Sequence, residues 1–231
     1  MARGACGSRV KRTNIQHDTA KGFSLGRFGD DPHAFFGHVY SDVAPWEVGG
    51  AQPDMARMLE DYPPADPVLD LGSATGDLAI ALALQGHNVV GLEFVQSAVD
   101  RAREKAAALA PEVSARLRFE VGDATMPSAL GVRFGSVLDS GFIHLLDPDE
   151  TDRFVADLRD AVAPGGRYYL HEFAIEFPID NVPRAITGDE IHSRFNADTG
   201  WRVVEVRPAV FHNRVAQPTP AIVACIERLA D

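Results

Sequence analysis

Two acids stand at the ends of short apolar runs, where a carboxylate can meet a ligand. Asp70 lies within the run 68–71, and Glu93 closes the run 88–93. An acid about 20 residues past a small-residue turn can accept hydrogen bonds from both hydroxyls of a ribose, as in nucleotide-binding folds. Glu93 therefore predicts a ligand that carries a ribose. The alternative for Glu93 is a solvated or helix-capping acid.

The turn that follows Asp70 has the composition of a ligand cradle. It is built from small residues, Gly72, Ser73, Ala74, Thr75 and Gly76. Glycine lets a ligand approach the backbone closely, and the N–H groups at a helix N-terminus point outward. A dinucleotide-binding turn would carry a third glycine where Asp77 stands, which speaks against an NAD-type oxidoreductase. The other alternative is an ordinary glycine-rich strand-to-helix turn.

Residues 68–77 resemble motif I of the class I S-adenosylmethionine (SAM) methyltransferases. SAM carries no pyrophosphate, so such a turn needs only to let the methionine tail and the ribose lie flat against the backbone. Asp70 suits the ammonium group of that tail. The resemblance implies SAM as the cofactor and methyl transfer as the activity. A SAM-binding protein without catalysis, recruited for interaction, is a further hypothesis.

A second segment precedes motif I and resembles a narrower branch of these enzymes. Residues 40–53 match the Tyr…Pro-Trp-x-x-Gly-x-x-Gln-Pro segment of the thiopurine S-methyltransferase-like enzymes. That branch includes halide/thiol methyltransferases and bacterial heterocycle or quinone methyltransferases. The resemblance implies that Trp46 and Gln52 contact the cofactor. Tyr40 and Trp46 are expected to shape the pocket, because aromatic faces attract a sulfonium cation.

The resemblance implies further SAM contacts after the later strands. Phe94 follows Glu93, and Asp123 is expected to accept a hydrogen bond from the adenine amine. Gly122 and Ala124 flank Asp123, and the small side chain of Ala124 leaves room for the adenine ring. The alternative is that the Gly-Asp pair is an ordinary turn. Asp139 and Ser140 end the fourth strand. Ligands of open α/β sheets lie beyond the carboxyl ends of the strands, so both should face the crevice.

Histidines are the candidate general bases. A thiolate or halide acceptor needs no strong base, whereas a phenol or a ring nitrogen can need one. The candidates are His38, His144, His171 and His212. His144 is favoured by its place after the fourth strand, and we select His144, Tyr40 and His38 as catalytic candidates. A lone histidine is more often structural. No His, Asp or Glu spacing resembles a metal site, which argues against the Mg-dependent catechol O-methyltransferases.

The elements that must position these residues are those of an α/β protein. Apolar runs predict strands at 68–71, 88–93, 116–121, 134–139, 167–173, 201–206 and 220–229. Helices are predicted at 54–62, 78–84, 96–110, 149–162 and 188–195. The resemblance implies a Rossmann-like class I methyltransferase three-layer sandwich. Its seven-stranded sheet would be mostly parallel, with an antiparallel last strand inserted.

The chain of 231 residues suits one α/β domain with additions. We expect residues 1–53 to form a tail and an aromatic cover, and residues 54–231 to form the SAM-binding core. The cover holds Phe23, Phe28 and Trp46, and we expect it to order on SAM binding as a lid; a short helix packed outside is the alternative. The loop 174–187 is expected to contact the substrate.

Charge and composition restrict the partners. The net charge of -11 disfavours nucleic acid and anionic membranes, which both attract basic surfaces. No apolar run reaches the roughly 20 residues of a membrane helix, and the basic N-terminus lacks the apolar region of a secretory signal. Cys6 and Cys225 lack metal spacing and fit a cytoplasmic protein. We expect a monomer or homodimer that methylates S, N or O of a small apolar or aromatic molecule, such as a natural product or xenobiotic.

Overall fold

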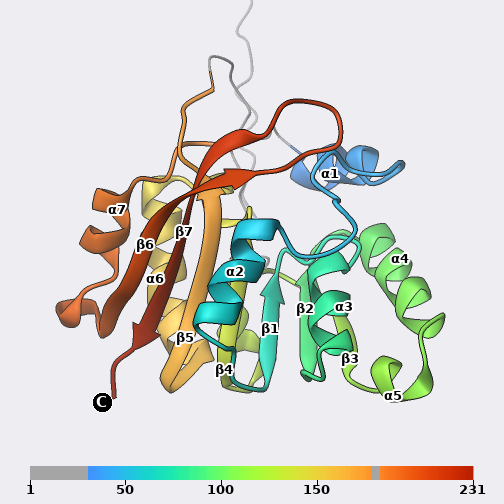
Figure 1. Cartoon of the computed structure of the whole chain (residues 1–231), viewed down its shortest axis with the longest axis horizontal. Helices are drawn as coiled ribbons and strands as arrows, with labels where there is room; N and C mark the ends of the chain where they lie inside the picture. Colours follow the sequence, from blue (N-terminus) through green and yellow to red (C-terminus); the bar gives the residue numbers. More distant parts are fainter. Residues whose placement is uncertain (1–30, 178–182, 231) are drawn as a thin grey trace, which may run out of the picture.

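A seven-stranded sheet forms the centre of the molecule (Figure 1). The structure is a computed structural model that describes residues 31–177 and 183–230. The strands are β1 (Val68–Leu71), β2 (Val89–Glu93), β3 (Leu117–Val121), β4 (Phe134–Ser140), β5 (Val162–Phe173), β6 (Trp201–Phe211) and β7 (Thr219–Arg228). Their order in the sheet is β3-β2-β1-β4-β5-β7-β6. The predicted three-layer α/β fold is confirmed.

The strand directions are also those expected. β1 pairs in parallel with β2 and β4, and the same direction continues to β3 and β5. β7 lies between β5 and β6 and is antiparallel to both. Because β6 returns to the direction of β5, the carboxyl ends of six strands meet at one edge of the sheet. Ligands of open α/β sheets bind at that edge.

Helices cover both faces of the sheet. They are α1 (Pro32–Val39), α2 (Pro53–Asp61), α3 (Asp77–Leu84), α4 (Gln96–Ala107), α5 (Pro111–Ser114), α6 (Pro148–Ala161) and α7 (Gly188–Arg194). Alternate residues of β5 belong to two different hydrophobic clusters: Tyr168 packs with α6, and Tyr169 packs in the cluster of α2 and α3. This alternation follows from the period of two in a strand. None of the described helices is long and apolar enough to cross a membrane.

Several element ends differ from the predicted ones. The helix expected at 96–110 ends at Ala107, and β5 begins at Val162. β6 continues to Phe211 although the sequence contains Pro208. A proline is tolerated there because β6 is the edge strand and needs hydrogen bonds only toward β7. The predicted end at residue 206 was wrong for this reason.

The described part of the N-terminal cover packs on the carboxyl edge of the sheet. Phe36, Tyr40 and Ala44 are buried in the same cluster as Leu71 and Phe142. The loop between β6 and β7 reaches the same place, next to α1 in Figure 1, where the Arg214 N–H donates to the Pro45 carbonyl at 2.8 Å. The predicted tail and the first part of the cover, with Phe23 and Phe28, lie outside the described residues. Residues 178–182 of the expected substrate loop do as well.

Candidate active site

A cavity of about 250 Å³ opens at the carboxyl edge of the sheet. The last residues of five strands line it: Leu71, Glu93, Ser140, Phe173 and Phe211. The described cover contributes Phe36, Tyr40 and Trp46 from the other side. The wall is therefore acidic at the ends of β1 and β2 and aromatic around the rest.

The small-residue turn after β1 forms one wall of this cavity. Gly72 and Ala74 have φ angles of 59° and 48°, in the left-handed region. A Cβ added to Gly72 would lie 3.3 Å from the Phe142 ring, so a side chain there would crowd the wall. Gly76 does not line the cavity. A Cβ on Gly76 would come within 2.7 Å of the Phe119 ring, so this glycine serves the packing of α3 on β3 and not the ligand.

Asp70 brings an unsatisfied acceptor to the cavity. Its side chain is 3 % exposed, and its Oδ2 atom has no hydrogen-bond partner among the described residues. Burial, reinforced by the negative charges of Asp139 and Glu93, raises the pKa of Asp70 to about 8. The Ser73 hydroxyl is likewise buried without a partner in the described part of the chain. Such atoms cost free energy unless a ligand satisfies them.

Glu93 is shared between the turn and the cavity. Its Oε2 atom accepts the Ala74 N–H at 3.1 Å, and its Oε1 atom accepts the Val95 N–H at 2.9 Å. A carboxylate oxygen can accept a second bond, so Glu93 keeps capacity for a ligand diol. Burial raises the pKa of Glu93 above its ordinary value. The same carboxylate thus holds Ala74 in its strained conformation and faces the pocket beside Phe94.

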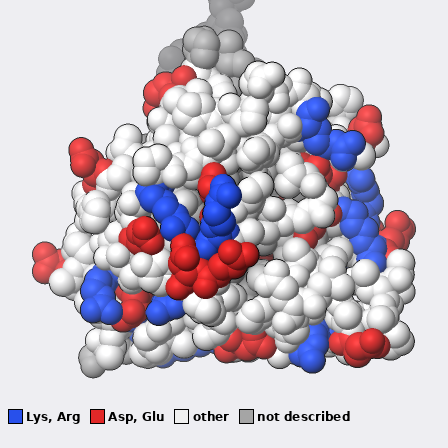
Figure 2. All heavy atoms as spheres, in the orientation of Figure 1, with Lys and Arg blue, Asp and Glu red and all other residues white. Residues whose placement is uncertain are grey.

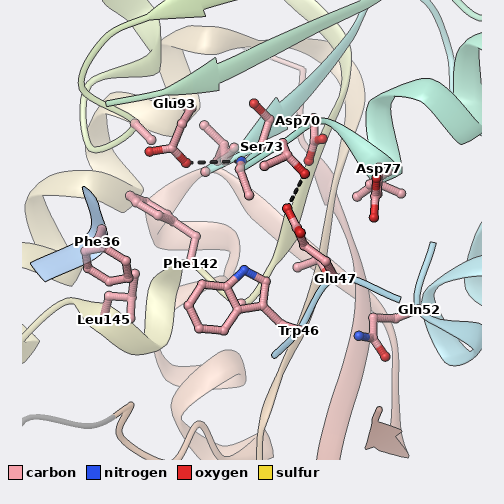
Figure 3. A pocket seen from close by; sticks show the side chains of 18 of the residues that line it. Phe36, Trp46, Glu47, Gln52, Asp70, Ser73, Asp77, Glu93, Phe142 and Leu145 are labelled. Carbon is pink, nitrogen blue, oxygen red and sulfur yellow. Dashed lines mark hydrogen bonds between the residues drawn. The ribbon is translucent and has the colours of Figure 1, made fainter. Parts of the chain in front are cut away.

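A second acid, Glu47, reaches the turn from the cover. Its buried carboxylate accepts the Thr75 hydroxyl, and Figure 3 shows this bond and the Glu93 bond as dashed lines. Lys105 donates to the Thr75 hydroxyl oxygen at 2.5 Å and to Asp77 at 2.7 Å. Sequence reasoning missed Glu47. The sequence could have indicated Glu47 by its position directly after Trp46 in the segment 40–53.

Gln52 anchors the cover to the chain just after β6 and also lines the cavity. Its amide exchanges two hydrogen bonds with the backbone of His212, at 3.0 and 2.9 Å. Gln52 still lines the cavity, as does Trp46 (Figure 3). The Asp77 carboxylate accepts the Gly49 N–H at 3.1 Å and adds another tie. The cover is therefore fixed to β6 and to the start of α3.

Tyr40 lies deep in the aromatic part of the wall. It is 6 % exposed, and its ring meets Trp46 edge-on with centroids 6.0 Å apart. Burial and the nearby Glu93 and Glu47 carboxylates hold the pKa of Tyr40 well above its usual value. The hydroxyl therefore stays protonated near neutral pH, which fits a wall residue or a donor and not a base.

His144 is the one catalytic histidine candidate that lines the cavity. It lies in η4 (Ile143–Leu145), directly after β4, and is 4 % exposed. Its Nδ1 atom lies against the carboxyl group of Glu172 of β5, and its ring stacks on Phe173 with centroids 5.0 Å apart. Burial raises the pKa of Glu172 to about 7. A buried acid thus holds one edge of the imidazole.

Several predicted residues lie elsewhere. His38 is exposed on α1 and does not line the cavity. His171 stacks on the wall residue Phe211 but does not itself line the cavity. Asp139 is also absent from the wall. Its carboxylate accepts the N–H groups of residues 142 and 143 and the Tyr168 hydroxyl, and so it fixes η4. The expectation that Asp139 faces the crevice was wrong because these local donors hold it beneath η4.

The turn after β3 meets the cavity through one residue. Ala124 lines the wall, whereas Gly122 and Asp123 do not. The Asp123 Oδ1 atom accepts the Thr125 N–H and hydroxyl, at 2.8 and 2.6 Å. Its Oδ2 atom is buried and has no partner within the described residues. That atom is the feature of Asp123 that fits a ligand donor such as an amine.

Comparison with known proteins agrees with this geometry. Residues 68–166 match the family model described as methyltransferase domain. The 2-heptyl-1-hydroxyquinolin-4(1H)-one methyltransferase of Mycobacteroides abscessus is 28% identical over 167 residues, which are 71% of each chain. Residues 68–166 therefore carry a methyltransferase domain.

Solved structures share the fold of this methyltransferase domain. One concerns the conversion of a disulfide bond into a thioacetal group during echinomycin biosynthesis. It has a TM-score of 0.71 and 24% identity, covering 84% of this chain and 90% of the other. The glycopeptide N-methyltransferase MtfA with bound SAM has a TM-score of 0.61 and 20% identity, covering 79% and 96%.

The cavity of the methyltransferase domain fits the chemistry of SAM. The unpartnered Oδ2 atom of Asp70 and the buried Ser73 hydroxyl can satisfy polar groups of a ligand. Gly72 keeps the wall open where a side chain would crowd it. Trp46 and Tyr40 present aromatic rings, which attract a cation such as a sulfonium.

Proposed function

We propose that this protein transfers the methyl group of SAM to a heteroatom of a small, flat, largely apolar acceptor. One observation carries the proposal: the same cavity joins an acidic wall, with Asp70 and Glu93, to an aromatic wall that contains His144. The first wall suits the polar groups of a cofactor, and the second suits an aromatic acceptor. The quinolone-type substrate named for the Mycobacteroides abscessus relative supports this acceptor class.

The cofactor would lie across the turn after β1. Asp70 would bind the ammonium of the methionine tail, and Glu93 would accept hydrogen bonds from the ribose diol. The backbone and side chains of the turn would support the tail: Gly72, Ser73, Ala74 and Thr75. Phe94 and Ala124 would flank the adenine, with the Asp123 carboxylate accepting from its amine. SAM supplies the methyl group on a positively charged sulfur, which makes that carbon an electrophile.

The acceptor would enter on the aromatic side. Phe142, Leu145, Phe173, Pro183 and Phe211 line that part of the cavity. Their rings and methyl groups exclude water and hold a flat molecule in place, which aligns its heteroatom for an in-line displacement. Ser140 and His144 are the polar groups on this side. Trp46 and Gln52 would close the cofactor end, with residues up to 53 acting as a cover.

Two measurements test the proposed function. Calorimetry with SAM, S-adenosylhomocysteine and NAD should show binding of the first two and none of NAD. A SAM-consumption screen over thiols, phenols, quinols and hydroxylated heterocycles should then identify a methylated product. NAD binding in place of SAM would overturn the proposal. SAM binding without any product across the screen would favour a non-catalytic SAM-binding protein.

A further inference from the structure

A lysine that lies outside the cavity holds two residues of its wall. Lys105 is in the last turn of α4. Its ammonium donates to the Thr75 hydroxyl oxygen at 2.5 Å and to the Asp77 Oδ1 atom at 2.7 Å. Thr75 and Asp77 line the cavity, whereas Lys105 does not. Lys105 can therefore act on a ligand in the cavity only through these two residues.

The same two wall residues are bonded to the cover. The Thr75 hydroxyl donates to the Glu47 carboxylate, and the Asp77 Oδ2 atom accepts the Gly49 N–H at 3.1 Å. Figure 3 shows Glu47 and Asp77 at the pocket. Because Glu47 and Gly49 are only two residues apart, these bonds close a ring in which the Lys105 ammonium donates to both sides. One side chain of α4 thus connects the small-residue turn to the cover by two routes.

The ammonium also supplies positive charge behind an acidic wall. Glu47, Asp70, Asp77 and Glu93 line the cavity, and no lysine or arginine lies among the described residues that do so. Lys105 bonds directly to Asp77 and is one hydroxyl group away from Glu47, which is 6 % exposed. A buried acid that loses its compensating cation is strongly disfavoured in its charged form. Without Lys105, the Glu47 and Asp77 carboxylates would repel each other across the turn.

Arg101 shows by contrast what is particular to Lys105. It lies one turn earlier on the same face of α4, and its guanidinium donates to the carbonyls of Tyr40 and Asp42 at 2.9 and 2.8 Å. Arg101 therefore holds the cover directly. Lys105 reaches the cover only through Thr75 and Asp77, so it ties the position of the cover to the shape of the turn.

We propose that Lys105 is a positioning residue for SAM, because it fixes the turn after β1 and the cover as one unit. The cofactor then meets a wall whose polar groups are already in place, which lowers the ordering cost of binding. SAM that binds on the turn would also tighten the cover through the same bonds. The inference rests on the proposed function, which places the methionine tail of SAM on this turn.

The first test compares Lys105→Met with Arg103→Met. Both variants remove a cation from α4, but the Arg103 guanidinium donates to the Phe119 carbonyl of β3, at 2.7 and 3.2 Å. By calorimetry, Lys105→Met should bind SAM about tenfold more weakly, the size of one lost charge-assisted hydrogen bond, and Arg103→Met should change the affinity by less than about twofold. Equal affinities of Lys105→Met and the wild type would overturn the inference and leave the proposed function intact. Equal losses in the two variants would also overturn it.

The second test separates the charge of Lys105 from its packing. The side chain of Lys105 is 37 % exposed, so a thiol in its place can be alkylated. Lys105→Cys treated with 2-bromoethylamine regains an ammonium on a stem of lysine length, whereas iodoacetamide adds a neutral amide. The ammonium form should regain most of the SAM affinity, and the amide form should stay weak. Wild type treated with each reagent is the control for Cys6 and Cys225. Equal affinities of the two alkylated forms would reduce Lys105 to a packing role and overturn the inference.

The third test needs neither SAM nor activity. In the unliganded protein, amides of residues 44–49 and 73–77 should exchange hydrogen faster in Lys105→Met than in the wild type, and those of Arg103→Met should not. Unchanged exchange of both segments in Lys105→Met would overturn the inference, whether or not SAM binds. Failure of the wild type to bind SAM, with this exchange difference present, would instead count against the proposed function alone.

Discussion

The buried acids of this site both hold neighbouring groups of the chain in place and lie at the cavity. Glu93 holds the N–H of Ala74, whose φ of 48° is unusual for a residue with a side chain, and it also faces the cavity. Glu47 fixes the Thr75 hydroxyl from the cover. The carboxylates are positioned by bonds to the backbone and to a hydroxyl before any ligand is considered, which is the preorganisation that binding requires.

The first prediction concerns Glu93. Glu93→Gln keeps one acceptor oxygen but removes the charge that strengthens bonds to a diol. We expect SAM affinity to fall by about tenfold or more, about 1.4 kcal/mol, while a methionine fragment without ribose binds as before. Calorimetry of both ligands measures this, with Glu104→Gln on the exposed side of α4 as the control. Equal losses of affinity for the two ligands would show that Glu93 does not bind the ribose.

At the scale of elements, the cover is joined to the core by polar ties at both ends. Gln52 exchanges two hydrogen bonds with His212, and Gly49 donates to Asp77. Arg101 of α4 donates to the carbonyls of Tyr40 and Asp42 at 2.9 and 2.8 Å. Residues 40–52 therefore form a wall that is anchored to three elements, namely α3, α4 and the end of β6.

The second prediction follows from the Glu47 tie. Glu47→Ala removes the acceptor of the Thr75 hydroxyl and of the Ala44 N–H. Each lost hydrogen bond costs about 1 kcal/mol, so amides in 40–52 should exchange about fivefold faster or more. Hydrogen exchange with mass spectrometry measures the change, and Glu60→Ala on the exposed face of α2 is the control. Equal exchange in both variants would show that Glu47 does not hold the cover.

The third prediction is that SAM tightens the same segment. Methyl transfer must exclude water, which favours closure of the cover over a bound cofactor. With saturating SAM, amides in 35–52 should exchange more slowly, and those of β1, β4 and β5 should change little. If the segment is equally protected with and without SAM, the cover is a fixed layer and acceptors enter elsewhere.

The sequence predicted the elements well and their ends less well. The strand, small-residue turn and helix at 68–84 follow from apolar runs and glycine, because local chemistry decides them. β6 extends past Pro208 because it is an edge strand, and a strand's place in the sheet is not a local property. In the site, Glu93 and His144 line the cavity, and their roles in binding and catalysis stay predictions. Glu172 was not foreseen, because only tertiary folding brings β5 against η4.

The whole molecule buries four carboxyl groups near its cavity. Asp70, Glu93, Asp139 and Glu172 are all buried near the carboxyl edge of the sheet, and burial raises the pKa of each. On the outside, the face in Figure 2 carries cationic side chains interspersed with anionic ones. Stability is therefore expected to depend on the interior acids more than on surface pairs, which contribute little.

The fourth prediction is a loss of stability as the pH rises. The pKa of Asp70 is about 8 in the fold against an ordinary 3.8, so the folded state binds more protons than the unfolded state between these values. Its stabilising effect is complete below about pH 4 and is lost as the pH rises through about 8; Glu172, with a pKa of about 7, adds to this.

Denaturant titrations from about pH 5 to about pH 9 should thus show a falling free energy of unfolding. The free energy of unfolding of Asp70→Asn should fall less steeply, because the asparagine side chain cannot ionise. This variant should also bind SAM poorly. Asp157→Asn, which changes the α6 partner of Ser128, is the control. Parallel curves for the wild type and Asp70→Asn would contradict the assigned pKa of Asp70.

The most direct test of the central claim follows the methyl group itself. SAM with a deuterated methyl group, the wild-type protein and a hydroxylated heteroaromatic acceptor should yield one equivalent of S-adenosylhomocysteine for each methylated product. Mass spectrometry and NMR should place the label on a heteroatom of the acceptor, and His144→Asn should slow its transfer. A label found on carbon, or a cofactor that binds with no transfer to any acceptor of the screen, would contradict the account.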